Sequence, residues 1–103
     1  MKTKALLAIA LLSASPANAG SIDYTDPLMA SVAGIFFANG CNVAVPDQEK
    51  KRVVRMMSSV FADRALGITE TIKLDVETRF GSFDLATRTD ICGRVATAYE
   101  GMK

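Results

Sequence analysis

The order of hydrophobic and polar positions predicts four helices after residue 25. Asp26 followed by Pro27 is typical of a helix start, because Asp accepts hydrogen bonds from free backbone N–H groups and Pro is tolerated at the first helical position. The first helix is expected over 28–38, ending at the following Asn-Gly pair in a left-handed conformation. No charged residue occurs from 27 to 46. A helix that is apolar on nearly every side is typical of a buried central helix.

The second helix has the clearest amphipathic pattern in the chain. Asp47 is expected to be its N-cap, and the helix is expected to run to about Leu66, where Gly67 stops it. Apolar residues at helical spacing form one face, and polar residues form the other. The face expected to be inward comprises Val53, Val54, Met57, Val60, Phe61 and Ala65. The face expected to be outward comprises Lys51, Arg52, Arg55, Ser58, Ser59 and Asp63.

The segment 68–80 fits two structures. Every fourth residue from Ile72 to Phe80 is apolar, as on one side of a helix, whereas 72–77 also alternates apolar and charged residues as a strand would. We expect a helix here. The alternative is an α+β fold with a short two-stranded pairing of 41–45 and 72–77.

A last helix is expected from Asp84, as its N-cap, through Glu100. The side chains expected to face inward are Leu85, Cys92, Val95, Ala96 and Tyr99. Together these segments predict an all-α fold, a small four-helix domain with one disulfide.

The first 19 residues have the three parts of a cleavable signal peptide. Two lysines precede eight uncharged apolar residues at 5–12, and the Ala-Asn-Ala triplet at 17–19 fits the cleavage rule. We expect cleavage after Ala19 and a periplasmic or secreted protein with a single domain over 20–103. Its first residues, 20–25, are polar and are expected to be mobile. Eight apolar residues are too few to cross a hydrocarbon core of about 30 Å, so no stable membrane insertion is expected.

Cys41 and Cys92 are the only cysteines. In an exported chain such a pair predicts one structural disulfide. Closing a loop of about 50 residues removes unfolded-state entropy worth roughly 4 kcal/mol. A redox pair is disfavoured, because those cysteines usually occur as Cys-x-x-Cys. Small exported domains often need such a bond, since they bury too little surface otherwise.

The composition excludes most catalytic chemistry. The chain contains no histidine, which removes Ser-His and Cys-His pairs and the usual zinc sites. No glycine-rich phosphate loop occurs. Paired carboxylates remain, as Asp75 with Glu77 and Asp84 with Asp90. Any acidic surface offers such pairs, so we expect solvated charges, no enzyme, no cofactor and no metal site.

Two surfaces are candidates for contact with a protein partner. Phe36 and Phe37 either form an apolar contact or belong to the core. Lys51 and Arg55, in the basic cluster 50–55, either are solvated or meet an anionic partner or lipid headgroup. No aromatic residue interleaves this cluster, and the net charge is +1, or −1 without the signal peptide, so nucleic-acid binding is not expected. We expect a non-enzymatic binding protein, whose oligomeric state the sequence does not predict.

Two other functions stay open, an enzyme inhibitor or immunity-type protein and an acid-stress periplasmic chaperone. The chain is similar to the small acid-stress chaperones of the periplasm in size, helicity and two widely spaced cysteines. This resemblance is compositional, and only 11 residues follow Cys92, where those proteins have a longer helical tail. It implies client binding at low pH, where protonated acids leave an excess of positive charge that loosens the fold.

Overall fold

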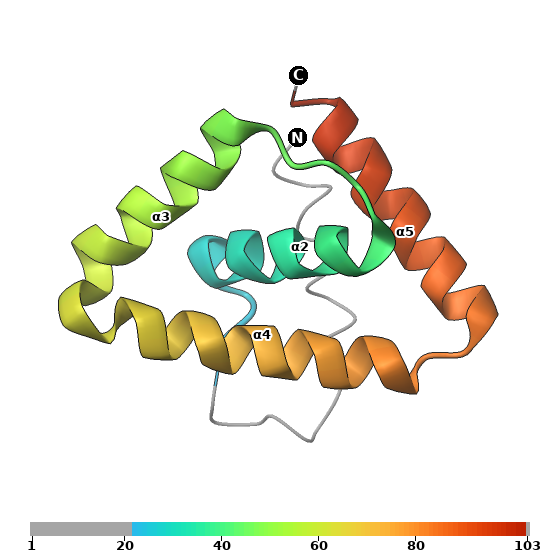
Figure 1. Cartoon of the computed structure of the whole chain (residues 1–103), viewed down its shortest axis with the longest axis horizontal. Coiled ribbons are helices and arrows are strands. Elements are labelled where there is room, and N and C mark those ends of the chain that lie inside the picture. Colours follow the sequence, from blue (N-terminus) through green and yellow to red (C-terminus); the bar gives the residue numbers. More distant parts are fainter. Residues whose placement is uncertain (1–21, 103) are drawn as a thin grey trace.

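The computed structural model describes residues 22–102, and these form four α-helices and no strand (Figure 1). The all-α prediction is confirmed. The alternative pairing of 41–45 with 72–77 is wrong, because 72–77 lies within a long helix. The signal peptide predicted over 1–19 lies outside the described residues. The elements are α2 (Pro27–Cys41), α3 (Asp47–Phe61), the 3-10 helix η2 (Ala62–Arg64), α4 (Ala65–Ser82) and α5 (Leu85–Glu100).

Helix α2 lies in the middle of the molecule, and α3, α4 and α5 surround it as the three sides of a triangle (Figure 1). Each of the three packs on α2, and α4 makes the most extensive contact. This arrangement fits the prediction of a central first helix, since α2 carries no charge to desolvate. Its buried residues are Leu28, Met29, Ala30, Val32, Ala33, Gly34, Phe37 and Ala38.

The start of α2 is as predicted, but its end is three residues later. Asp26 is the N-cap, and its Oδ1 accepts a hydrogen bond from the N–H of Leu28 at 2.8 Å. Gly40 remains helical, and Asn42 adopts the left-handed conformation instead, with φ 58°. Asn is one of the few residues other than Gly that does so readily. The extra turn makes Cys41 the last residue of the helix.

The boundary between α3 and α4 differs from the prediction. The second helix ends at Phe61 rather than Leu66, and Gly67 lies inside α4. The chain changes direction at Ala62, which has φ 52°. A continuous helix over 47–66 would be about 30 Å long and would extend beyond α2, which is about 22 Å long. The turn lets both halves pack on α2.

Three residues expected to face inward are largely exposed: Val54 (63%), Val60 (60%) and Leu85 (78%). Asp47 is the first residue of α3 rather than its cap, which is Pro46. The helix predicted over 68–80 and the cap at Asp84 are confirmed.

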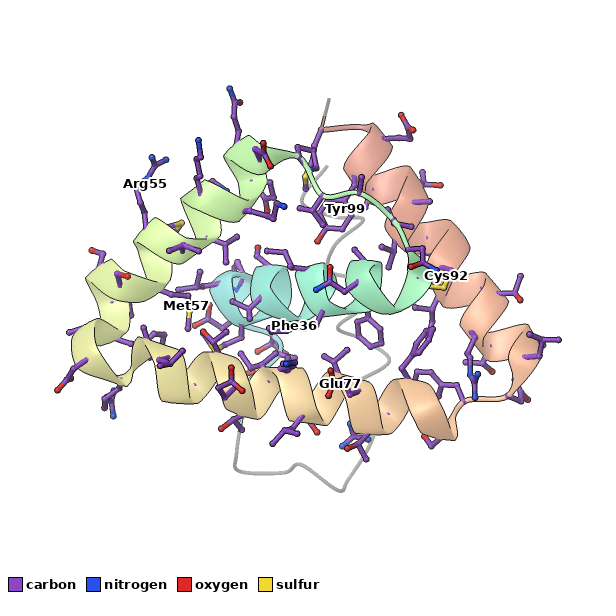
Figure 2. The ribbon with its side chains drawn as sticks, in the orientation of Figure 1. Phe36, Arg55, Met57, Glu77, Cys92 and Tyr99 are labelled. Carbon is purple, nitrogen blue, oxygen red and sulfur yellow. A yellow bond between two sulfur atoms is a disulfide. The ribbon has the colours of Figure 1, made fainter. Side chains whose placement is uncertain are left out.

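The disulfide is confirmed. Cys41 at the end of α2 and Cys92 in α5 have Cα atoms 5.4 Å apart and bonded sulfur atoms (Figure 2). The bond therefore joins two helices, and it fixes α5 to the central helix. Such a bond is compatible with a location outside the cytoplasm.

The chain before α2 is anchored, so the expectation of a mobile lead-in is wrong at Tyr24. Its side chain is only 3% exposed. The hydroxyl donates to Oδ2 of Asp75 at 2.5 Å, and Oδ1 of Asp75 lies 3.6 Å from Nε of Arg79. These contacts hold the segment before α2 against α4.

Tyr99 of α5 packs against a glycine of α2. Its side chain is 3% exposed and lies inside the corner between α5 and α3 (Figure 2). A Cβ atom placed on Gly34 would lie 2.8 Å from the Tyr99 hydroxyl oxygen. Glycine at 34 therefore lets α5 approach α2 closely.

We predict that Gly34→Ala destabilises the protein by about 1 kcal/mol. Alanine usually gains about 1 kcal/mol over glycine within a helix, but here overpacking against Tyr99 costs about 1–3 kcal/mol. Urea unfolding followed by circular dichroism measures the change. A Gly34→Ala, Tyr99→Phe double variant lacks the crowded hydroxyl oxygen. In that background alanine at 34 should be more stable than glycine. Gly93→Ala in α5 is the matched control, because a Cβ atom placed there would meet no packed neighbour within 4 Å, and it should stabilise. A stabilising Gly34→Ala would contradict the packing.

We also predict that stability falls as the pH rises above about 10. Burial raises the pKa of both tyrosine hydroxyls, and for Tyr24 the hydrogen bond to Asp75 raises it further. Above a pH of about 10 the unfolded chain loses these protons while the folded chain keeps them, so the free energy of unfolding decreases. Urea unfolding at pH 8 to 11 measures the slope. Tyr24→Phe should remove about half of it. An unchanged slope in a Tyr24→Phe, Tyr99→Phe double variant would contradict this assignment.

Candidate functional site

An apolar groove opens at the corner where α3 turns into α4. Its volume is about 580 Å³, and the middle of α2 forms its floor. Figure 2 shows Phe36 of α2 and Met57 of α3 between the helices on this side. The apolar side chains from α2 and α3 are Val32, Ile35, Phe36, Val53, Val54 and Met57. The corner itself adds Ala62, Ala65 and Leu66.

Val54 is exposed at the groove because adjacent apolar residues of a helix cannot share one buried face. Successive side chains point about 100° apart around a helix. Val53 is 3% exposed against α2, so Val54 is turned to the mouth of the groove and is 63% exposed. Leu66, which is 72% exposed, stands on the opposite wall. Two large apolar side chains therefore face the solvent across one apolar hollow.

Four polar residues complete the lining, and two of them are charged. Lys50 is at the end of the first turn of α3, and Asp63 is in η2 at the corner. Lys50 Nζ lies 3.6 Å from Asp47, but both side chains are more than half exposed, so this pair contributes little to stability. The hydroxyl of Thr69 donates to a backbone carbonyl of α4 at 2.8 Å, and Ser58 supplies the remaining hydroxyl.

The outer side of α3 carries a second, polar hollow of about 640 Å³. Lys51, Arg52 and Arg55 line it, together with Glu49. Arg52 donates to both carboxylate oxygens of Glu49 at 2.8 Å, which neutralises it locally. The ion pairs described for residues 22–102 include neither Lys51 nor Arg55. Arg55 points away from the rest of the molecule (Figure 2).

The candidate partner residues do not form one surface. Phe37 is 1% exposed and belongs to the core, packed edge-on against Phe80 with ring centroids 6.2 Å apart. Phe36 is half-buried at the groove. Lys51 and Arg55 lie on the outer side of α3. Of the four, Phe36 alone lines the apolar groove.

The four candidate carboxylates lie outside the groove. Asp84 caps α5, and its hydrogen bonds with Thr87 hold the pKa of the Asp84 carboxyl below its ordinary value. Asp90 accepts from an arginine one turn further along α5 at 2.9 Å. Asp75 accepts from Tyr24 and pairs with an arginine of α4. Glu77 is exposed on α4 (Figure 2). At least three of them have structural roles.

The sequence interpretation missed the groove because it placed Val54 in the core and Leu66 at a helix end. The signal was the pair of adjacent valines at 53 and 54, since one helix face cannot bury both. The sequence around Leu66 gives no comparable indication that its side chain is exposed. Its exposure follows from the turn at Ala62, which starts a new helix just before it.

Residues 22–102 show neither a candidate metal site nor a candidate membrane-spanning helix. Within 22–102, no group of three or more His, Cys, Asp or Glu side chains is placed to hold a metal ion. No helix in that range combines the length and the apolar character that crossing a membrane requires. Comparison with known proteins adds no relative, since no family model, no curated protein and no solved structure matches this chain.

Proposed function

We propose that this chain is a small exported binding protein that takes an apolar ligand of small-molecule size into the groove between α2, α3 and α4. The observation that carries the proposal is the groove itself. Ligand pockets in proteins usually have volumes of about 300–1,000 Å³ and mostly apolar walls with few polar groups. The groove has about 580 Å³ and nine apolar lining residues of thirteen.

A ligand in the groove would remove apolar surface from water at its mouth. Val54 and Leu66 are exposed in the free protein, and a ligand lying between them would cover both. Burial of apolar surface gains about 25 cal/mol per Å². The buried floor residues below, such as Val32 and Met57, belong to the core, so the site is formed before the ligand arrives.

The proposal is non-enzymatic. The sequence contains no histidine, and the groove holds a single carboxylate, Asp63, rather than a pair. The candidate pairs at 75 and 77 and at 84 and 90 lie elsewhere. Export is supported by the signal-peptide pattern of the sequence and by the disulfide, which is favoured outside the cytoplasm.

A small ligand fits the groove better than a protein partner does. A stable protein interface covers about 800 Å² on each side, and most such interfaces are broad surfaces rather than single hollows. The alternatives are a protein partner, an inhibitor or immunity-type role, and an acid-stress chaperone. For these functions, Lys51 and Arg55 are the exposed residues that a partner could contact.

The test is binding of an uncharged apolar probe, N-phenyl-1-naphthylamine, whose fluorescence rises in apolar surroundings. We predict saturable binding by the oxidised protein. Val54→Asp or Leu66→Asp should weaken it at least tenfold, because each places a charge at the mouth of the groove. Both sites are exposed, so the fold should tolerate the change.

Leu74→Asp and Leu85→Asp are the matched controls. These residues are 63% and 78% exposed, close to Val54 and Leu66, but they lie outside the groove. They should leave probe binding unchanged. If the probe does not bind, or if all four variants weaken it equally, the groove is not a ligand site.

A further inference from the structure

We infer that the polar hollow on the outer side of α3 is a second binding site, which takes a small organic phosphate monoester through Lys51 and Arg55. This site is separate from the apolar groove, and it does not depend on the function proposed for the groove. Three observations carry the inference: the net charge of the residues that line the hollow, the lack of a partner for two of them, and the size of the hollow.

The described residues that line the hollow carry an excess of two positive charges. Its cations are Lys51, Arg52 and Arg55, and its one anion is Glu49. The remaining lining residues are uncharged. An anion that enters the hollow is therefore attracted, whereas a cation is repelled.

Glu49 is held by Arg52 and does not neutralise the other two cations. Nε and Nη2 of Arg52 donate to the two carboxylate oxygens of Glu49, each at 2.8 Å. The Glu49 side chain is only 11% exposed. A bidentate pair of this kind is stronger than a single exposed ion pair, and it occupies both oxygens of the carboxylate. The excess charge of the hollow therefore lies on Lys51 and Arg55.

Lys51 and Arg55 have no partner among residues 22–102. Neither makes an ion pair or a hydrogen bond there. They are four residues apart on α3, where side chains lie side by side and like charges repel. Asp47, four residues before Lys51, lies instead 3.6 Å from Lys50, which lines the apolar groove. An anion between Lys51 and Arg55 would replace their repulsion by two attractions.

A phosphate monoester matches this excess of charge. It carries a charge of about −1.5 to −2 at pH 7 and has three oxygens that accept hydrogen bonds. A carboxylate or a phosphate diester carries one negative charge and would leave one cation uncompensated. The Cβ atoms of residues four apart on a helix are about 5–6 Å apart, so two long side chains can hold one phosphate group between them. The guanidinium of Arg55 binds two phosphate oxygens at once, and Lys51 adds a point charge.

The hollow has room for an organic group beside the phosphate. Its volume of about 640 Å³ lies within the range of about 300–1,000 Å³ that is usual for pockets that hold organic ligands. Its uncharged lining consists of Pro46 before α3, Gln48 in the first turn of α3 and Met102 after α5. Pro46 and Met102 offer apolar contact, and the amide of Gln48 offers hydrogen bonds to hydroxyl groups. Arg55 extends at the outer rim, so the phosphate lies toward the solvent (Figure 2).

The experiment compares three probes by nuclear magnetic resonance titration of the backbone amides at pH 8. Glycerol 3-phosphate is a dianion with an organic group, inorganic phosphate is a dianion without one, and dimethyl phosphate carries one charge. We expect glycerol 3-phosphate to give saturable shifts in 48–55 and at Met102. It should bind about fivefold more tightly than dimethyl phosphate, because one cation loses its partner in the diester complex. Inorganic phosphate should bind more weakly than glycerol 3-phosphate.

Variants of neighbouring lysines locate the phosphate. Lys51→Gln and Arg55→Gln should each weaken glycerol 3-phosphate about fivefold. Lys50→Gln is the matched control, because it removes the same charge from the next residue of α3, which lines the groove and pairs with Asp47. It should change the affinity less than twofold. All three residues are exposed, so the fold should tolerate the changes.

Vesicles distinguish a soluble ester from a lipid headgroup, since phosphatidic acid carries the same phosphate monoester. Sedimentation with phosphatidylcholine vesicles that contain phosphatidic acid, and loss of this sedimentation in Lys51→Gln, would identify the lipid as the source. Binding of glycerol 3-phosphate without sedimentation would identify a soluble ester. Either result supports the site.

Three results would overturn the inference. The first is that neither glycerol 3-phosphate nor the vesicles bind. The second is that dimethyl phosphate or inorganic phosphate binds as tightly as glycerol 3-phosphate, since the match of charge or the organic group is then wrong. The third is that Lys50→Gln weakens binding as much as Lys51→Gln, since the attraction is then a general effect of charge. Binding of the apolar probe in the groove should be the same in Lys51→Gln, so a failure of this site leaves the proposed function intact.

Discussion

Burial of the uncharged helix α2 is the interaction on which the rest of this structure depends. A domain of this size has room for one central element, and that element must carry no side chain that needs water. Helix α2 carries no charged side chain over its whole length, and its exposed Asn39 lies in the last turn. Each surrounding helix buries its own apolar residues against it, such as Val53 of α3, Ile72 of α4 and Ile91 of α5. Apart from the corner that joins α3 to α4, these helices contact one another much less than they contact α2.

Three helices around one leave three corners, and the chain fills them differently. Tyr99 fills the interior of the corner between α3 and α5. At the corner between α4 and α5, Arg88 donates to the carbonyls of Phe83 and Gly81. Further along α5, the disulfide joins Cys92 to the end of α2. At the corner between α3 and α4 the chain turns at Ala62, and beside this turn lies the apolar groove.

Much of the fold could be predicted because its signals are local. Asp26 and Asp84 cap their helices through contacts within three residues, and the absence of charge in 27–46 marks the central helix. The disulfide follows from the number of cysteines and the export pattern. The turn at Ala62 could not be predicted, because no glycine or proline lies there and alanine rarely adopts a positive φ. The groove depends on that turn, so the groove could not be predicted from the sequence either.

Because every other helix packs on α2, we expect α2 to be the last part of the protein to open. Amide hydrogen exchange of the oxidised protein, followed residue by residue by nuclear magnetic resonance, tests it directly. Amides at the centre of α2, such as those of Val32 and Phe37, should exchange only through global unfolding, so their free energies should equal that from urea unfolding. Amides of α3 and α5 should exchange through smaller openings. If the amides of α2 exchange faster than those of α4, the central helix does not hold the fold together.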